Sequence, residues 1–141
     1  MNMRIRCYRD GDFLDLEKIL KKTNLYESEF DQRENYKLQI DHDPTSILVA
    51  AEDEKIVGAV ISIYNPFASF IFHLCVDPEY QNKGIGTKLM DKAEENLLAR
   101  GVNKPIIYVG MENRKVVDFY KKRNWDMCPS VIPMVKKLEG I

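Results

Sequence analysis

The spacing of hydrophobic residues at the start of the chain predicts one strand followed by two helices. Residues 3–8 form a short strand-like run, and over residues 10–22 the apolar side chains recur at helical spacing, with Asp10 placed to cap that helix. A second helix is expected over residues 27–40, before the breaker at Pro44. Its thin apolar stripe consists of Phe30 and Leu38.

Three strand-like runs follow in the middle of the chain, over residues 46–52, 55–64 and 67–76. Only short polar turns separate them, and links of this length favour an antiparallel meander. In the third run apolar side chains occupy both faces, which predicts a central strand.

Helical and strand patterns alternate in the next part of the chain. An apolar stripe over residues 85–100 predicts an amphipathic helix that ends at Gly101. Residues 105–109 then read as a strand and residues 113–123 as a helix. Strand, helix and strand in this order imply a right-handed parallel crossover.

The tail over residues 125–138 is expected to add one or two short strands. Pro129 and Pro133 lack a backbone N–H, so any strand there should be broken or lie at a sheet edge. The whole order predicts a mixed α/β (α+β) fold, with one open mixed sheet of about six to seven strands and helices on both faces. At 141 residues and 45% hydrophobic content, a single domain is expected over residues 1–141.

Composition narrows the classes of partner. The 21 Lys and Arg residues against 22 Asp and Glu leave a net charge of -1, which argues against binding of nucleic acid or anionic lipid. No apolar run approaches the ~20 residues of a membrane span, and a cytoplasmic protein is expected. The odd number of cysteines, without CxxC spacing, fits a reducing compartment and free thiols, and no metal site is expected. These cysteines are Cys7, Cys75 and Cys128.

The loop between the third strand of the meander and the next helix carries the candidate chemistry. Gly84 and Gly86 stand where this helix begins. The first-turn amides of a helix have no internal partner, and the helix dipole adds partial positive charge there. Because glycine has no Cβ, a ligand can approach the backbone closely. The segment therefore predicts an anion site suited to a phosphate.

Two common nucleotide motifs do not fit this loop. The chain has no GxxxxGK[ST] spacing of the P-loop type. The dinucleotide fingerprint GxGxxG fails because Leu89 stands where the third glycine belongs. The residues by themselves thus indicate an anion site and leave its ligand open.

Two motifs resemble those of the GNAT superfamily of N-acetyltransferases. The first, Gln81-x-x-Gly84-x-Gly86, follows a strand that ends at Pro78 and resembles the family's motif A, [QR]xxGx[GA]. The second begins at Asn113, continues to Phe119-Tyr120 and is similar to the family's fourth-helix signature. The resemblance covers nearly the whole chain, whose overall look is that of the small stand-alone bacterial enzymes of the YpeA type.

The sequence departs from the family pattern at two places. Asn124-Trp125 stands where the family usually has Gly-Phe or Gly-Tyr, and Asn tolerates the left-handed conformation that Gly would supply. The tail is also short for the family's pair of long strands. The second departure puts acceptor specificity in doubt more than activity.

The resemblance implies an acetyl-CoA-dependent N-acyltransferase in which an amine attacks the thioester directly, without a covalent enzyme intermediate. The pantetheine arm would lie like an added strand along the backbone of Leu74 and Val76, where a main-chain N–H would stabilise the oxyanion. Cys75 is assigned to packing. The coenzyme-binding residues implied in this way are Leu74, Cys75, Val76, Gln81, Asn82, Lys83, Gly84, Ile85, Gly86, Thr87, Asn113 and Tyr120.

Tyr120 is the catalytic residue that the resemblance implies, because it matches the family tyrosine near the coenzyme sulfur. A phenol with a pKa of about 10 can donate a proton to a thiolate whose thiol has a pKa of about 8.5. The general base stays open between Glu112, Glu52, His73 and a chain of waters. A small-molecule or peptide amine is expected over the first two helices and the loop after the fifth strand. The aromatic and acidic groups there are Tyr26, Glu27, Glu29 and Asp31.

Two alternatives remain at this point. A non-catalytic coenzyme A-binding sensor or regulatory domain would keep the same fold and the same loop. A phosphopeptide- or nucleotide-binding domain would share only the anion site. The acceptor amine is unassigned, and the protein is expected to be a monomer or a homodimer.

Overall fold

A computed structural model describes residues 2–110 and 112–140. The chain divides into two compact units, Met1–Tyr108 and Val109–Ile141, which are described separately. The single domain expected over residues 1–141 stays a prediction.

The first unit is built on a five-stranded sheet in the order β1-β2-β3-β4-β5. The pairs β1–β2, β2–β3 and β3–β4 are antiparallel and β4–β5 is parallel, which confirms the meander and the central place of β4. The strands are β1 (Met3–Cys7), β2 (Ile47–Glu52), β3 (Lys55–Ile63), β4 (Phe70–Val76) and β5 (Ile106–Ile107).

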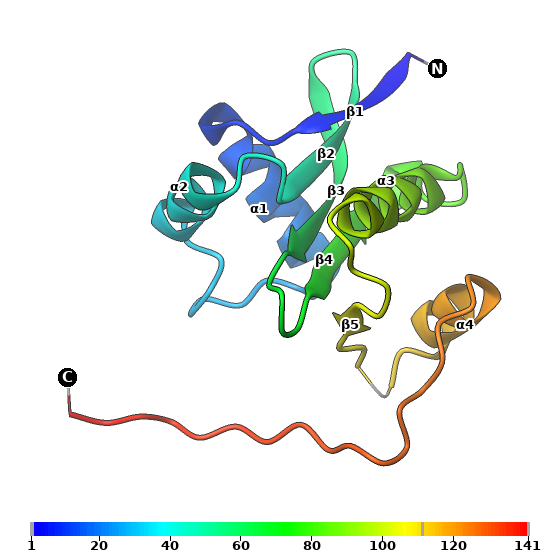
Figure 1. Ribbon diagram of the computed structural model, residues 1–141. Helices are drawn as coiled ribbons and strands as arrows, with labels where there is room; N and C mark the ends of the chain where they lie inside the picture. Colours follow the sequence, from blue (N-terminus) through cyan, green and yellow to red (C-terminus); the bar gives the residue numbers. More distant parts are fainter. Residues whose placement is uncertain (1, 111, 141) are drawn as a thin grey trace. The chain divides into compact units, whose positions relative to one another are not determined.

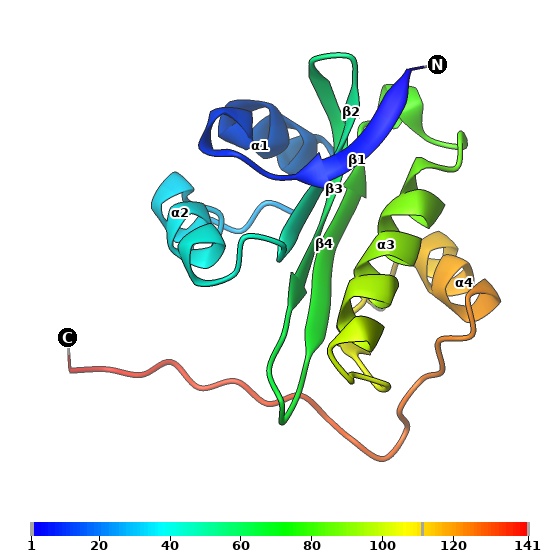
Figure 2. The same ribbon diagram turned by 45° about the horizontal axis from the view of Figure 1, so that its top comes forward.

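Helices cover both faces of this sheet, as the sequence predicted. The first face carries α1 (Phe13–Lys22) and α2 (Arg33–His42), and the opposite face carries α3 (Ile85–Ala99), as Figures 1 and 2 show. One-turn helices, η1 (Asp10–Asp12) and η2 (Pro78–Tyr80), precede α1 and follow β4. The mixed α/β class is therefore confirmed.

The main hydrophobic core lies between the sheet and the first two helices. Leu16 and Leu20 of α1 and Tyr36 of α2 pack there against β-strand residues that include Cys75. Burial raises the pKa of the Cys75 thiol to about 12, because the thiolate would lose its hydration. Its place in the core agrees with the packing role assigned to it.

The second helix differs from its prediction. It begins at Arg33 rather than near residue 27, and Phe30 and Leu38 are both exposed. Tyr36 is its buried residue, at 4% exposure. The preceding residues form a turn instead, in which the Asp31 N–H donates to the Glu27 carbonyl and the Asp31 carboxylate accepts from the Glu27 N–H. A hydrogen bond from the backbone to a side chain can thus take the place of the first helical turn.

Asp10 also has a different role from the predicted helix cap. Its carboxylate accepts two hydrogen bonds from the Arg33 guanidinium, at 2.8 and 2.9 Å. The backbone N–H of Arg9 is satisfied by Asp12, which also pairs with Arg6. Asp12 therefore satisfies the backbone at the start of the helical segment, and Asp10 joins this segment to α2.

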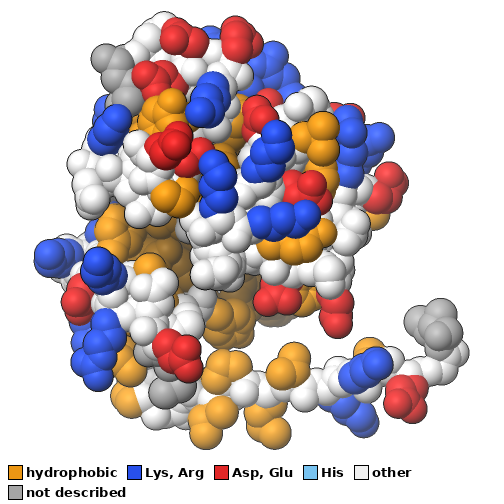
Figure 3. Space-filling model, turned by 180° about the vertical axis from the view of Figure 1, so that it is seen from behind, with side chains coloured by type: hydrophobic (Ala, Val, Ile, Leu, Met, Phe, Trp, Pro, Cys, Tyr) orange, Lys and Arg blue, Asp and Glu red, His pale blue; other side chains and the backbone are white. Residues whose placement is uncertain are grey.

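The second unit contains α4 (Arg114–Lys122), and the described residues that follow it form no strand. The one or two strands predicted over residues 125–138 are therefore wrong, and the sheet has five strands rather than six to seven. Pro129 and Pro133 each remove a ladder donor from this stretch, which disfavours strand pairing. Figure 3 shows hydrophobic side chains projecting along it. Val131 and Met134 are exposed.

We expect replacement of Gly58 by alanine to destabilise the first unit. A Cβ at this β3 position would lie 2.8 Å from the carbonyl oxygen of Cys75 and 3.2 Å from a methyl group of Leu89. The backbone of β4 would have to move, at a cost of about 1–3 kcal/mol in unfolding free energy. Urea denaturation measures the loss. Gly11→Ala is the matched control, since its Cβ would meet nothing within 4 Å, and equal stability of the two variants would contradict this packing.

We also expect the three cysteines to differ in reactivity. Cys7 and Cys128 are exposed, whereas Cys75 is buried with a raised pKa. Because alkylation requires an accessible thiolate, iodoacetamide should modify Cys7 and Cys128 in the native protein and reach Cys75 only after unfolding. Peptide mass spectrometry measures the three rates. Native labelling of Cys75 as fast as that of Cys128 would show that this part of the core is open.

Candidate functional site

The connection from β4 to α3 is folded by its own side chains. The Asp77 carboxylate accepts from the Glu79 N–H at 3.1 Å and so caps the short helix η2. The Gln81 side-chain amide donates to the Val76 carbonyl at 3.0 Å. Gln81, expected to contact the coenzyme, therefore also ties the loop to the end of the strand.

The N-terminus of α3 is open to an anion. Gly84 precedes the helix with φ +80°, and Asn82 also adopts a left-handed conformation at φ +64°. No side chain caps Gly84, and the first turn of α3 has no acidic residue. Ile85 is buried and anchors the helix, while Thr87 is exposed. The first amides of α3 thus combine unsatisfied N–H groups with the positive end of the helix dipole.

Two lysines add positive charge beside this loop. The ammonium groups of Lys55 and Lys83 each lie 5.2 Å from the ring centroid of Tyr80, within cation–π distance. Lys55 comes from the start of β3 and Lys83 from the loop itself. Two ammonium groups thus lie around Tyr80, in a connection that also contains the acids Asp77 and Glu79.

The edge of β4 that faces β5 is only half paired. The parallel ladder joins Phe70 to Ile106 and Ile71 to Ile107 and goes no further. From Phe72 to Val76 no strand formed by residues 2–110 or 112–140 pairs with β4 on that side. Such an edge presents backbone donors and acceptors that an extended ligand can pair with. It leads directly into the loop at the start of α3.

A β-bulge interrupts the same stretch of β4. Ile61 pairs with Phe72 and Ala59 with Cys75, so two β4 residues, His73 and Leu74, stand opposite one residue of β3. His73 takes the left-handed conformation, with φ +56°. Because a bulge breaks the alternation of side chains, it can send two neighbouring side chains to one face.

The side chain of His73 points to the face of the sheet that carries α1 and α2, where it meets Asp31. Its Nε2 lies 2.9 Å from an Asp31 carboxylate oxygen. Asp31, only 1% exposed, also accepts from the Tyr36 hydroxyl at 2.6 Å and from the Glu27 N–H at 2.8 Å. Burial opposes the charged form, but these hydrogen bonds outweigh it and lower the pKa of the Asp31 carboxyl. Asp31 is therefore a buried, ionised carboxylate that accepts hydrogen bonds from three other residues.

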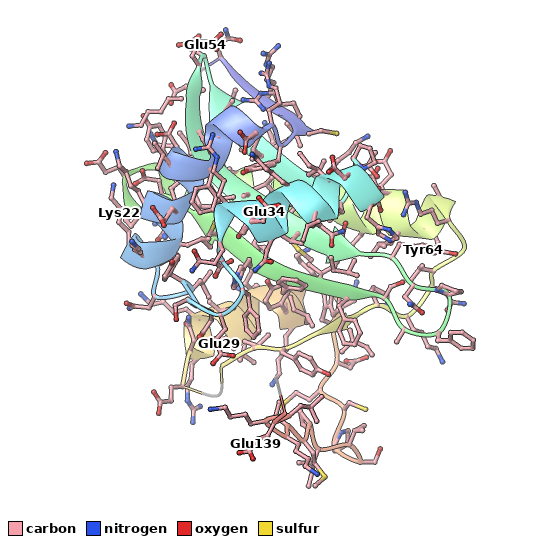
Figure 4. The ribbon with its side chains drawn as sticks, turned by 90° about the vertical axis from the view of Figure 1, so that its left-hand side faces the viewer. Lys22, Glu29, Glu34, Glu54, Tyr64 and Glu139 are labelled. Atoms are coloured by element: carbon pink, nitrogen blue, oxygen red, sulfur yellow. The ribbon has the colours of Figure 1, made fainter. Side chains whose placement is uncertain are left out.

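A shallow pocket of about 120 Å³ opens beside Asp31 on this face. Apolar side chains form most of its wall, and Asn35 and Gln39 contribute amides from one side of α2. Figure 4 looks onto this face, with α1 and α2 in front of the sheet and Glu29 labelled on the segment between them. The lining residues are Phe30, Asp31, Asn35, Tyr36, Gln39, Ile47, Ile61, Ile63 and Phe72.

The predicted site residues fall into both units. Leu74 to Val76 and Gln81 to Thr87 are contiguous in the first unit, along the half-paired edge and the loop. Glu52 lies at the β2–β3 hairpin, in register with Lys55. The aromatic Tyr26 and the acids Glu27 and Glu29 lie on the segment between α1 and α2, with Asp31.

Asn113, Tyr120 and Glu112 belong to the second unit. The Asn113 side chain accepts from the Val116 N–H at 3.4 Å and caps α4, as expected of an Asn at this position. Tyr120 is buried, with its ring 5.2 Å from that of Phe119 and 5.9 Å from that of Trp125. Glu112 is exposed just before the helix.

Sequence reasoning missed the connection of Asp31 to His73. The two residues are 42 positions apart, and nothing in the spacing of either predicts the bulge that brings them together. The only local signal was a histidine inside an otherwise apolar strand.

Neither a metal-binding cluster nor a membrane-spanning helix is found among the residues that the structure describes. Over residues 2–110 and 112–140, no group of three or more His, Cys, Asp or Glu side chains is arranged to hold a metal ion. In the same residues, no helix has both the length and the apolar character that crossing a membrane requires.

The chain is similar to proteins of known sequence and of known structure. An acetyltransferase of Sodalis glossinidius is 29% identical over 136 residues, which are 96% of each chain. Among solved structures, Ard1 from Thermoplasma volcanium matches with a TM-score of 0.81 at 19% identity, over 91% of this chain and 85% of that one. The PaiA N-acetyltransferase from Thermoplasma acidophilum, solved in complex with coenzyme A, matches with a TM-score of 0.74 at 21% identity, over 87% and 89%.

The structural matches, all of low identity, confirm the fold expected from the sequence. The sequence profile of the acetyltransferase (GNAT) family matches residues 13–125, which include the loop at Gly84 and the helix that carries Tyr120. The strand, loop and helix that form the open anion site thus lie inside the matched region, and the chain belongs to the acetyltransferase (GNAT) family.

Proposed function

We propose that this protein transfers the acetyl group of acetyl-CoA to the amine of a small-molecule or peptide acceptor. One observation carries the proposal: the half-paired edge of β4 runs directly into the uncapped N-terminus of α3 at the left-handed Gly84. An extended arm that ends in a pyrophosphate matches this sequence of a strand edge and an anion site. Family membership and the coenzyme A complex of a structural neighbour support it.

In this proposal the first unit holds the coenzyme. The pyrophosphate accepts hydrogen bonds from the backbone between Gln81 and Thr87, with Lys83 contributing charge. The pantetheine arm pairs with the backbone of Leu74 and Val76, as an added strand would. Cys75 between them faces the core, so that only its backbone is available to the coenzyme.

The chemistry is direct transfer. The acceptor nitrogen attacks the thioester carbonyl, a backbone N–H near Val76 stabilises the oxyanion, and the carbon–sulfur bond breaks. Tyr120 then donates its phenolic proton to the departing thiolate. The Cys75 thiol is unsuited to act as a nucleophile, because burial raises its pKa to about 12.

We expect Gly84→Val to weaken binding of coenzyme A by about tenfold or more, equivalent to about 1.4 kcal/mol. A Cβ there meets no protein atom within 4 Å, so the added side chain would occupy the space of the pyrophosphate. Its φ of +80° also strains any branched residue. Gly101→Val is the matched control, since Gly101 has φ +87° and equally open surroundings but lies at the other end of α3.

Calorimetry with coenzyme A measures both affinities, and ATP serves as the competing ligand. Unchanged affinity in Gly84→Val, or an equal loss in Gly101→Val, would contradict the placement of the pyrophosphate. Tighter binding of ATP than of coenzyme A would favour a nucleotide-binding domain.

We expect Tyr120→Phe to lower turnover about 100-fold while leaving the affinity for acetyl-CoA unchanged, because it removes only the proton donor. Thiol release from acetyl-CoA is measured with a panel of alkyl amines, a polyamine, amino-acid amides and a peptide with a free N-terminus. If the wild-type protein binds the coenzyme but acetylates none of them, the non-catalytic sensor becomes the better account. Equal turnover of wild type and variant would remove Tyr120 from the mechanism.

A further inference from the structure

The bulge in β4 turns the side chains of two neighbouring residues, Phe72 and His73, to the same face of the sheet. Phe72 lines the pocket beside Asp31, and His73, the next residue, binds Asp31 itself. In a regular strand these two side chains would point to opposite faces of the sheet. The rings of Phe72 and His73 lie 5.4 Å apart in an edge-to-face arrangement. The bulge thus brings His73 to Asp31, which is one of the residues that line the pocket.

This placement costs backbone strain. His73 has φ +56° in the middle of a strand, a backbone region that is unfavourable for a non-glycine residue. A glycine or asparagine would adopt the same conformation at lower cost. The strain persists because the side chain is held by a buried carboxylate, at 12% side-chain exposure for His73 and 2% for Asp31.

The hydrogen bonds around Asp31 fix which imidazole nitrogen carries the proton. An ionised carboxylate only accepts, so the 2.9 Å contact requires His73 Nε2 to donate. In the neutral imidazole the other nitrogen, Nδ1, then carries the lone pair. Nδ1 makes no hydrogen bond to the part of the chain that the structure describes. It is thus a base whose orientation and tautomer are set by a second residue.

We propose that His73 Nδ1 accepts the proton of the acceptor amine and that Asp31 is the positioning residue that holds His73 in this tautomer. The inference rests on the proposed function, since His73 directly precedes the Leu74–Val76 backbone assigned to the pantetheine arm. It selects one candidate from Glu112, Glu52, His73 and water.

The reaction moves one proton from the amine to His73. The amine nitrogen forms a bond to the acetyl carbon, the carbon–sulfur bond breaks, and the N–H proton moves to His73 Nδ1. The imidazolium so formed is stabilised by the Asp31 carboxylate, as in other carboxylate–imidazole pairs. Tyr120 protonates the thiolate in the proposed function, and proton exchange with solvent then restores both side chains.

Ionisable groups surround His73 on this face of the sheet. They are Asp31 between α1 and α2, Tyr36 on α2 and Cys75 on β4. Burial raises the pKa values of Tyr36 and Cys75, so that both stay neutral, while Asp31 stays ionised. Among these groups the fixed charge is therefore negative, and it stabilises the imidazolium that proton transfer to His73 forms.

The decisive experiment compares His73→Asn with His42→Asn, using the best amine of the panel and acetyl-CoA. Asparagine tolerates the left-handed backbone but is no base. We expect kcat/KM of His73→Asn to fall about 100-fold or more, with unchanged coenzyme affinity. His42 is the exposed second histidine, and its variant should behave as wild type.

A nitrogen NMR experiment on the wild-type protein tests the tautomer without relying on a variant that folds. With ¹⁵N-labelled histidine, and His42→Asn for assignment, Nε2 of neutral His73 should be protonated and Nδ1 unprotonated. Asp31→Asn should mix the two tautomers and lower kcat more than it raises KM. A neutral His73 ring with its proton on Nδ1 in the wild-type protein would overturn the inference.

The two proposals fail in different ways. If wild-type protein releases thiol with an amine, and a folded His73→Asn variant keeps the full rate and the same pH profile, then His73 is not the base and the acetyl-transfer proposal stands. If no amine supports thiol release by the wild-type protein, the proposed function is overturned, and the role of His73 with it.

Discussion

The fold of the site depends on one constraint, the change of register within β4. Before the bulge Phe72 pairs with Ile61, and after it Cys75 pairs with Ala59, so β3 holds both halves of the strand while the residues between them are displaced. On the other side, pairing with β5 ends at Ile71. The strand is therefore firmly held along one edge and open along the other. This arrangement leaves the strand an edge that a ligand can pair with, turns its histidine inward and leads into the loop before α3.

Several interactions offset the strain of the bulge. Asp31 receives three hydrogen bonds, and because its pKa is lowered it contributes stability at neutral pH that is lost as the pH falls through the titration range of the folded carboxyl. The ring of Tyr36 packs against the rings of Tyr8 and Phe13 and so joins this polar cluster to the core. The opposite face is filled by α3, which approaches β3 closely because Gly58 lacks a side chain. The site is thus supported by the core on both sides of the sheet.

Local patterns were sufficient to predict much of this structure. The meander, the amphipathic α3 and the start of that helix at Gly84 follow from features within a few residues, such as alternation, a 3.6-residue period and glycines between a strand and a helix. Asn113 likewise caps the helix that its residue type predicts. The coenzyme and the role of Tyr120 came from resemblance to a family, which no periodicity supplies.

The errors concern tertiary contacts. Phe30 and Leu38 have the right spacing for a buried stripe, yet α2 turns Tyr36 inward because that hydroxyl reaches Asp31. Asp31 reads as a surface acid until its partners on two other elements are known. The register change in β4 depends on β3 rather than on a local turn sequence. The tail has apolar residues suited to strands, but Pro129 and Pro133 interrupt it and the described residues show no pairing.

The central claim is that the coenzyme lies along the open edge of β4 and ends at the start of α3. Backbone amide shifts of ¹⁵N-labelled protein, recorded as acetyl-CoA is added, test this most directly. The account predicts that the largest changes occur at Phe72 to Val76 and at Asn82 to Thr87, where the arm and the pyrophosphate meet backbone N–H groups. Saturable binding that moves other amides and leaves both segments unchanged would contradict it.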